Sequence, residues 1–92
     1  MRRFRKLAHC SSRELGSFKK IKIRISVMSF ISELAMKYNN ESQLVICQIE
    51  LERLKEEYET LLSNVYKRTG NFPGGGKIEV YRAGDIIEYY NE

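Results

Sequence analysis

The middle of the chain carries an unbroken heptad pattern. Apolar side chains recur at alternating spacings of three and four residues, in the order Leu44, Cys47, Leu51, Leu54, Tyr58, Leu61 and Val65. This spacing is typical of a helix that packs along a partner helix. Lys67 and Arg68 suit the carboxyl end of a helix, and Gly70 follows as a stop signal. We therefore predict a long helix over about residues 41–68, longer than a small domain needs for its own core.

A shorter helix is predicted just before it. Apolar residues at helical spacing begin after Ser26 or Ser29, namely Phe30, Ile31, Leu34, Ala35 and Tyr38. The pair Asn39-Asn40 tolerates a left-handed backbone, so the short helix is expected to end there. Asn40 with Gln43 fits a capping box at the start of the long helix.

The segment KKIKIRIS, residues 19–26, alternates isoleucine with a cation three times. Period two with β-branched residues favours a strand that carries its isoleucines on one face and its cations on the other: Ile21, Ile23 and Ile25 against Lys20, Lys22 and Arg24. A helix stays open as an alternative, because one set of apolar residues also falls at helical spacing: Phe18, Ile21, Ile25 and Met28.

After the long helix, residues 70–76 (GNFPGGG) predict a loop, and residues 77–92 predict a β-hairpin with its turn at Gly84. An isolated hairpin is unstable in water, so this one must dock on the helices, extend a sheet or pair with another chain. The glycines do not form a phosphate-binding loop. Five residues instead of four separate Gly70 from Gly76, Ile78 stands where Ser or Thr is required, and a strand follows in place of a helix.

Charge is distributed unevenly along the 92 residues. Residues 1–24 contain nine cations and one acid, and the remainder contains seven cations and eleven acids, within a net charge of +4. A basic arm over residues 1–18, followed by a domain over residues 19–69, suggests contact with a polyanion. A solvated tail and an organelle-targeting segment are the alternatives, since the first residues are rich in Arg and Ser.

Catalytic and metal chemistry find little support in the sequence. His9 is the single histidine, Cys47 lies on the apolar seam, and no residue is placed to orient a base beside Cys10. No zinc-ligand spacing, cofactor motif or membrane-spanning run occurs. We expect a protein that is not an enzyme, binds no cofactor and works inside the cell, in the cytoplasm or on the nucleoid, with an organelle not excluded.

Residues 19–60 resemble the ribbon-helix-helix family of dimeric transcriptional repressors. KKIKIRISVMSFISELA is similar to the strand and first helix of that family, and NNESQLVICQI to its turn and second helix. The resemblance implies an intertwined α+β homodimer that binds double-stranded DNA and regulates transcription. The longer second helix and the hairpin depart from the family pattern, and the first helix is one residue short.

The resemblance assigns roles to particular residues. Lys20, Lys22 and Arg24 would read bases in the major groove, and Asn40 and Ser42 would clamp a phosphate. The arm would add phosphate contacts through Arg2, Arg3, Arg5 and Lys6. The dimer core would contain Ile21, Ile23 and Ile25 with Phe30, Leu34, Val45, Ile46 and Ile49.

Two alternatives remain open. VYRAGDIIEYY resembles the late strands of the toxin superfamily that includes ribosome-dependent mRNA interferases and gyrase poisons. Proteins of that superfamily run strand, helical hairpin, antiparallel sheet, although this chain offers no final strand for catalytic side chains. The other alternative is an assembly subunit that docks on a protein partner through its long helix or hairpin while its basic arm contacts RNA.

Overall fold

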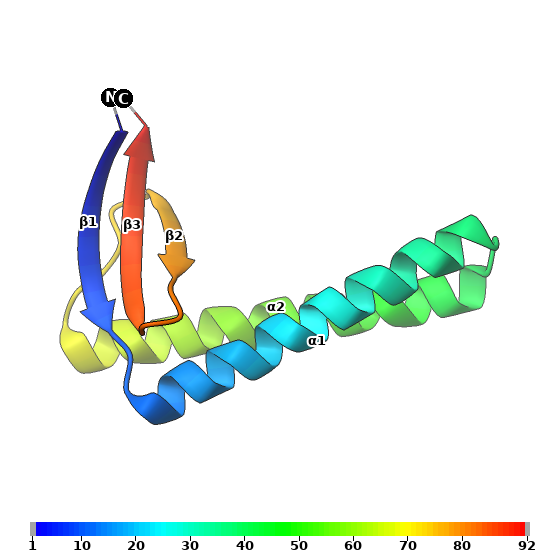
Figure 1. Ribbon diagram of the computed structural model, residues 1–92, viewed down its shortest axis with the longest axis horizontal. Coiled ribbons are helices and arrows are strands. Elements are labelled where there is room, and N and C mark those ends of the chain that lie inside the picture. Colours follow the sequence, from blue (N-terminus) through cyan, green and yellow to red (C-terminus); the bar gives the residue numbers. More distant parts are fainter. Residues whose placement is uncertain (1, 92) are drawn as a thin grey trace. The chain divides into compact units, whose positions relative to one another are not determined.

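The fold is α+β, and its order is a strand, two helices and two further strands. The computed structural model describes residues 2–91, with side chains from residue 3. Its elements are β1 (Arg2–His9), α1 (Ser12–Lys37), α2 (Glu41–Thr69), β2 (Lys77–Val80) and β3 (Asp85–Asn91) (Figure 1). This confirms the predicted class, the long second helix, the loop over residues 70–76 and the carboxyl-terminal hairpin.

The three strands form one antiparallel sheet in the order β1-β3-β2. Figure 1 shows β1 and β3 side by side along most of their length, with the shorter β2 on the other side of β3. The β1–β3 register runs from Arg2 opposite Asn91 to His9 opposite Asp85, with an irregularity between Lys6 and Ala8. The hairpin therefore gains stability by extending a sheet, one of the three outcomes expected for it.

The strand predicted over residues 19–26 is wrong, because the whole segment lies inside the 26-residue α1. A capping box starts this helix early: the Glu14 amide donates to Ser11 Oγ at 3.2 Å, and the Ser11 amide donates to Glu14 Oε1 at 2.8 Å. From that start the helical spacing of the apolar residues decides the outcome. Ile21 is buried, whereas Ile23 is 64% exposed, so the isoleucines share no common face. The short first helix was wrong for the same reason.

The amino-terminal arm was also misassigned, since Arg2–His9 forms β1 and α1 begins at Ser12. Leu7 and Ala8 are buried, and the Cys10 amide continues the connection by donating to the Gly84 carbonyl at 2.7 Å. The strand had no local signal strong enough to predict it, because the pairing that stabilises it is with residues 85–91 at the other end of the chain.

The turn between the helices follows the prediction. Asn39 has a φ of 54°, the left-handed conformation that asparagine tolerates. Asn40 Oδ1 accepts the Gln43 amide at 3.1 Å and so caps α2. The Gln43 side chain contacts Cys47 Sγ, so the reciprocal half of the predicted box is replaced by a contact inside the helix.

The chain divides into two compact units. The sheet unit comprises residues 1–18 and 61–92, and the helical unit comprises residues 19–60. Phe18, Leu62, Val65 and Ile86 belong to the core of the sheet unit. In the helical unit the buried apolar residues are Ile21, Ala35, Cys47 and Leu54. No helix within the described residues is long and apolar enough to cross a membrane.

Candidate nucleic-acid interface

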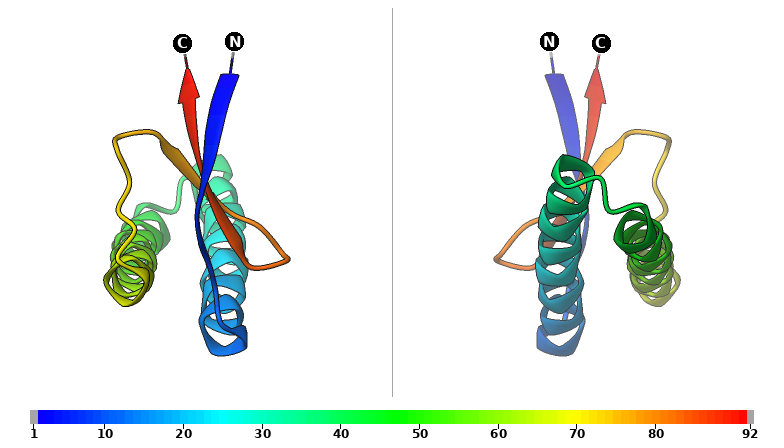
Figure 2. Two further views of the ribbon diagram at one scale, coloured as in Figure 1. Left: turned by 90° about the vertical axis from the view of Figure 1, so that its left-hand side faces the viewer. Right: turned by 90° about the vertical axis from the view of Figure 1, so that its right-hand side faces the viewer.

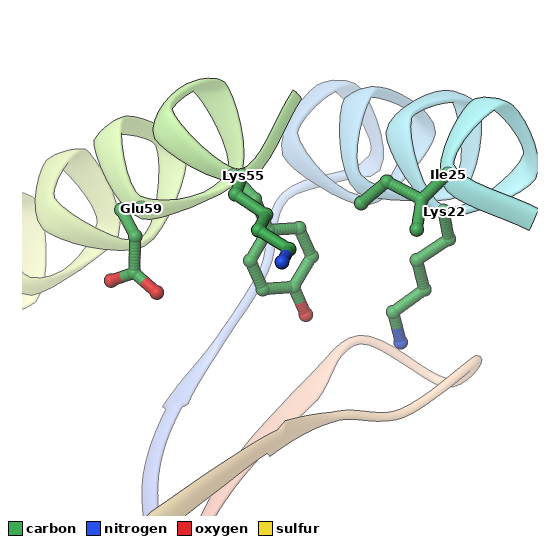
Figure 3. A pocket seen from close by; sticks show the side chains of 5 residues that line it. Lys22, Ile25, Lys55 and Glu59 are labelled. Carbon is green, nitrogen blue, oxygen red and sulfur yellow. The ribbon is translucent and has the colours of Figure 1, made fainter. Parts of the chain in front are cut away.

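The three cations expected to read bases lie on α1. Lys20, Lys22 and Arg24 are all exposed, but a helix does not align them in one row as a strand would. Arg24 Nη2 contacts Glu50 Oε1 of α2 at 3.2 Å. Lys22 lines a groove of about 270 Å³ between α1 and α2 together with Ile25, Lys55, Tyr58 and Glu59 (Figure 3). The predicted strand that carries its cations on one face is therefore not formed.

The residues expected to contact phosphate lie in two places. Arg3, Arg5 and Lys6 belong to β1, and the side chain of Arg2 is outside the described part of the structure. Asn40 uses its side-chain oxygen to cap α2, and Ser42 is exposed in the first turn of that helix. Asn40 therefore has a structural role of its own, whereas Arg3, Arg5 and Lys6 are exposed residues of β1.

One face of this sheet gathers aromatic side chains. Residues opposite one another in an antiparallel pair point to the same face, and Phe4 lies opposite Tyr89, as Lys6 lies opposite Ile87. We call the surface formed by Phe4, Lys6, Tyr81, Asp85, Ile87 and Tyr89 the aromatic face. A recess of about 340 Å³ is lined there by Phe4, Tyr81, Asp85, Ile87 and Tyr89.

The rings of Phe4 and Tyr89 are in contact, with Phe4 exposed and Tyr89 half-buried. The ring centroids of Phe4 and Tyr89 lie 6.2 Å apart with a 46° angle between the ring planes. Phe4 is 71% exposed, although it sits within a strand. The hydroxyls of Tyr81 and Tyr89 are hydrogen-bonded to each other, and the Tyr81 hydroxyl donates to Glu79 Oε2 at 3.1 Å. The hydrogen bond to Tyr89 is the main reason that the pKa of Tyr81 is raised.

Ion pairs border the aromatic face. Asp85 Oδ1 lies 2.9 Å from His9 Nδ1 and 3.0 Å from Lys6 Nζ, and Lys77 Nζ lies 3.7 Å from Glu79 Oε1. The hydrogen bonds from His9 and then Lys6 lower the pKa of Asp85. The cations at this border are thus paired with carboxylates. Because these ion pairs are exposed, solvent screens the attraction within them.

The opposite face holds a buried carboxylate. Glu88 is fully buried and accepts hydrogen bonds from Arg5 Nη2 at 2.8 Å, from the amides of Gly74 and Gly76 at 2.6 and 2.9 Å, and from the Tyr90 hydroxyl. Burial alone would raise its pKa, but the four hydrogen bonds outweigh burial and lower the pKa of Glu88 to about 2. Glu88 therefore ties the glycine-rich loop and β1 to β3.

Gly76 is required by this arrangement. A Cβ at this position would lie 2.5 Å from the Tyr89 carbonyl oxygen and 2.7 Å from Glu88 Cγ, closer than atoms can approach. The last glycine of the run is thus explained by a close approach to the backbone of β3.

The net charge of the chain resides in the sheet unit. Residues 1–18 and 61–92 contain nine basic and five acidic residues, a net charge of +4, whereas residues 19–60 contain seven of each. The aromatic face therefore belongs to the unit that attracts anions at long range.

The described residues offer little reactive chemistry. Cys10 is buried, and this burial is the main reason that the pKa of its thiol is raised. Cys47 is a buried residue of the helical unit. Among residues 2–91 no group of three or more metal-ligating side chains comes together.

Sequence reasoning missed Phe4, Tyr81 and Tyr89. A signal was present in RFRKLAH, where Arg3, Phe4, Arg5 and Lys6 place one aromatic side chain among cations near the chain start. The two tyrosines lie in the carboxyl-terminal hairpin, for which the sequence predicts a structure but no binding residues. In comparisons with known proteins, no family model, no curated protein and no solved structure matched the chain.

Proposed function

We propose that this protein binds single-stranded nucleic acid on the aromatic face of its sheet and catalyses no reaction. The observation that carries the proposal is the exposed Phe4 ring beside Tyr89 on an open sheet, within the unit that holds all the net positive charge. We place the protein in the cytoplasm, as its two unpaired cysteines favour.

Stacking supplies the affinity in this proposal. Every nucleic-acid base has a flat face that can stack on an aromatic ring, whatever the sequence. Stacking on an aromatic side chain contributes about 1–3 kcal/mol per base. The exposed Phe4 ring, with Tyr89 beside it, is accessible to unpaired bases, whereas a duplex keeps its bases stacked inside. The preferred partner is therefore a single strand of RNA or DNA, with little sequence preference.

Electrostatics adds to stacking. Because Lys6 and Lys77 are paired with carboxylates, attraction comes from the charge of the whole sheet unit more than from single contacts. Binding should weaken as salt rises, with log K falling by about 0.7 per phosphate neutralised on a single strand.

The experiment that tests the proposal is fluorescence anisotropy with labelled single-stranded RNA, single-stranded DNA and duplex DNA. Replacing Phe4 with Ala should weaken single-strand binding by about tenfold, since one base loses its stacking partner. Tyr38→Ala is the matched control: Tyr38 is an aromatic residue with the same 71% exposure, but it lies in the helical unit.

The same titration tests whether nucleic acid binds to the aromatic face or to the helical unit. Equal losses from Phe4→Ala and Tyr38→Ala, or no binding at low salt, would overturn the proposal. The duplex-reading regulator expected from the sequence requires the opposite result: a Lys22→Ala/Arg24→Ala variant loses duplex binding while Phe4→Ala does not.

A second candidate is a protein of toxin-like fold. The observed order of strand, helical hairpin and antiparallel strands agrees with that resemblance. Induced expression in bacteria tests this candidate, because a toxin should arrest growth or translation. Normal growth at high expression would count against it.

A further inference from the structure

The side of α1 that faces away from α2 carries a heptad pattern of its own. Ile25 and Met28 line the grooves between the two helices, which Figure 2 shows nearly end on as neighbours. On the opposite side of α1, exposed apolar residues are spaced by four, three and four residues: Ile23, Val27, Phe30 and Leu34. We call these four residues the outer seam, because this is the a/d spacing with which one helix packs along another.

The outer seam is open to solvent along its whole length. Ile23 is 64% exposed and Phe30 is 61% exposed. A stripe of neighbouring exposed apolar side chains marks an interaction surface. Because the stripe keeps to a and d positions, it is the narrow seam of a coiled coil rather than a wide apolar face. The spacing therefore favours a partner helix over a membrane surface.

A lysine bounds the outer seam at each end. Lys20 lies three residues before Ile23, and Lys37 lies three residues after Leu34, so both lysines continue the heptad spacing. Both are exposed, and neither forms an ion pair within residues 2–91. At about 1.5 Å per residue, the two lysines are about 25 Å apart along the helix. The seam thus has an apolar middle and a positive charge at each end.

The charge around the outer seam argues against pairing with α1 of a second copy. Residues 19–37 contain five basic residues and one acidic residue. Even without Arg24, which is paired with Glu50, the cations outnumber the acid. Two parallel copies of α1 would place Lys20 against Lys20, and two antiparallel copies would place Lys20 against Lys37. The surface complementary to the seam is therefore acidic at both ends.

The other helix of a second copy does not supply this complement. On the side of α2 away from α1, Val45 and Ile49 are the exposed apolar residues between Glu41 and Glu52. That stripe has two apolar residues where the outer seam has four. The partner is therefore a helix from a different protein.

We propose that the outer seam binds an amphipathic helix of another protein, with four apolar seam residues and an acidic residue at each end. The apolar residues of that helix pack between those of the outer seam, and its carboxylates pair with Lys20 and Lys37. The spacing from Lys20 to Lys37 is the same in both directions, so a partner helix of either direction meets this pattern. This binding is independent of nucleic-acid binding by the sheet unit.

Three synthetic peptides of about 20 residues test this partner directly. The first has leucine at the four seam positions, glutamate at both ends, and alanine or glutamine elsewhere to favour a helix. The second has lysine in place of the terminal glutamates. The third has the composition of the first, with its leucines moved off the seam. In fluorescence anisotropy with the full chain, the first peptide should bind about tenfold more tightly than either of the others.

Variants of the chain test the same contact from the other side. Ile23→Ala should weaken binding of the first peptide about tenfold, because the complex loses a covered apolar side chain. Met36→Ala is the control, since Met36 has the same 64% exposure on α1 but lies off the seam. A Lys20→Glu/Lys37→Glu variant should bind the second peptide more tightly than the first. Loss of folding cannot produce such a reversal of preference.

Other occupants of the outer seam give distinct results. A chain that binds none of the peptides, binds all three equally, or loses as much from Met36→Ala as from Ile23→Ala overturns the proposal. So does a wild-type dimer in sedimentation equilibrium that Ile23→Ala makes monomeric, because the seam would then bind a second copy. Binding to vesicles of phosphatidylglycerol and phosphatidylcholine that Ile23→Ala abolishes would overturn it in favour of a membrane surface.

Discussion

At the residue scale, Glu88 shows how one side chain connects a loop and two strands. Its carboxylate is fully buried and satisfied by Arg5, Tyr90 and two glycine amides. Removing the charge leaves buried amides with a poorer acceptor, which costs about 1–3 kcal/mol. We expect Glu88→Gln to lower the stability of the sheet unit by that amount, measured by urea unfolding at pH 7.

The same residue predicts a dependence on pH. The folded pKa of Glu88 is about 2, below its ordinary value of 4.5, so its contribution is present above pH 4.5 and is lost as pH falls toward 2. Thermal unfolding of the wild type should therefore lose stability across this window faster than Glu88→Gln does. Parallel curves for the two proteins would show that Glu88 is not ionised when buried.

At the element scale, the position where α1 starts decides whether residues 19–26 form a helix or a strand. KKIKIRIS satisfies both a strand period and a helix period, so its local pattern cannot choose between them. The choice comes from the capping box Ser11–Glu14, which lies outside the segment and was visible in the sequence as SSRE. By contrast, α2 could be predicted because seven seam residues agree with one period, and the hairpin because the glycine run precedes it and Gly84 marks its turn.

We expect Ser11→Ala to cost about 1 kcal/mol of stability, because the Glu14 amide loses its acceptor at the helix start. Urea unfolding followed by circular dichroism measures this. Ser12→Ala is the control, since Ser12 is the neighbouring exposed serine and already the first residue of the helix. An equal loss from both variants would mean that the cap does not fix where α1 begins.

At the scale of the whole molecule, the candidate site could not be predicted because its parts come from both ends of the chain. Phe4 meets Tyr89 through strand pairing that joins residues 2–9 to residues 85–91. Local patterns identify elements, but they do not tell which strands become neighbours. The charge asymmetry was visible in the sequence, whereas its assignment to one unit required the division of the chain.

The pairing of β1 with β3 also has a consequence for synthesis. A ribosome makes residues 2–9 well before residues 85–91, which form the only strand that pairs with them in the described structure. Until those residues have left the exit tunnel, β1 has an unpaired backbone, and Leu7 lacks the neighbours that bury it in the finished fold. The helical unit, made of residues close in sequence, can form much earlier. The sheet therefore assembles late, and until then β1 is exposed to aggregation and proteolysis.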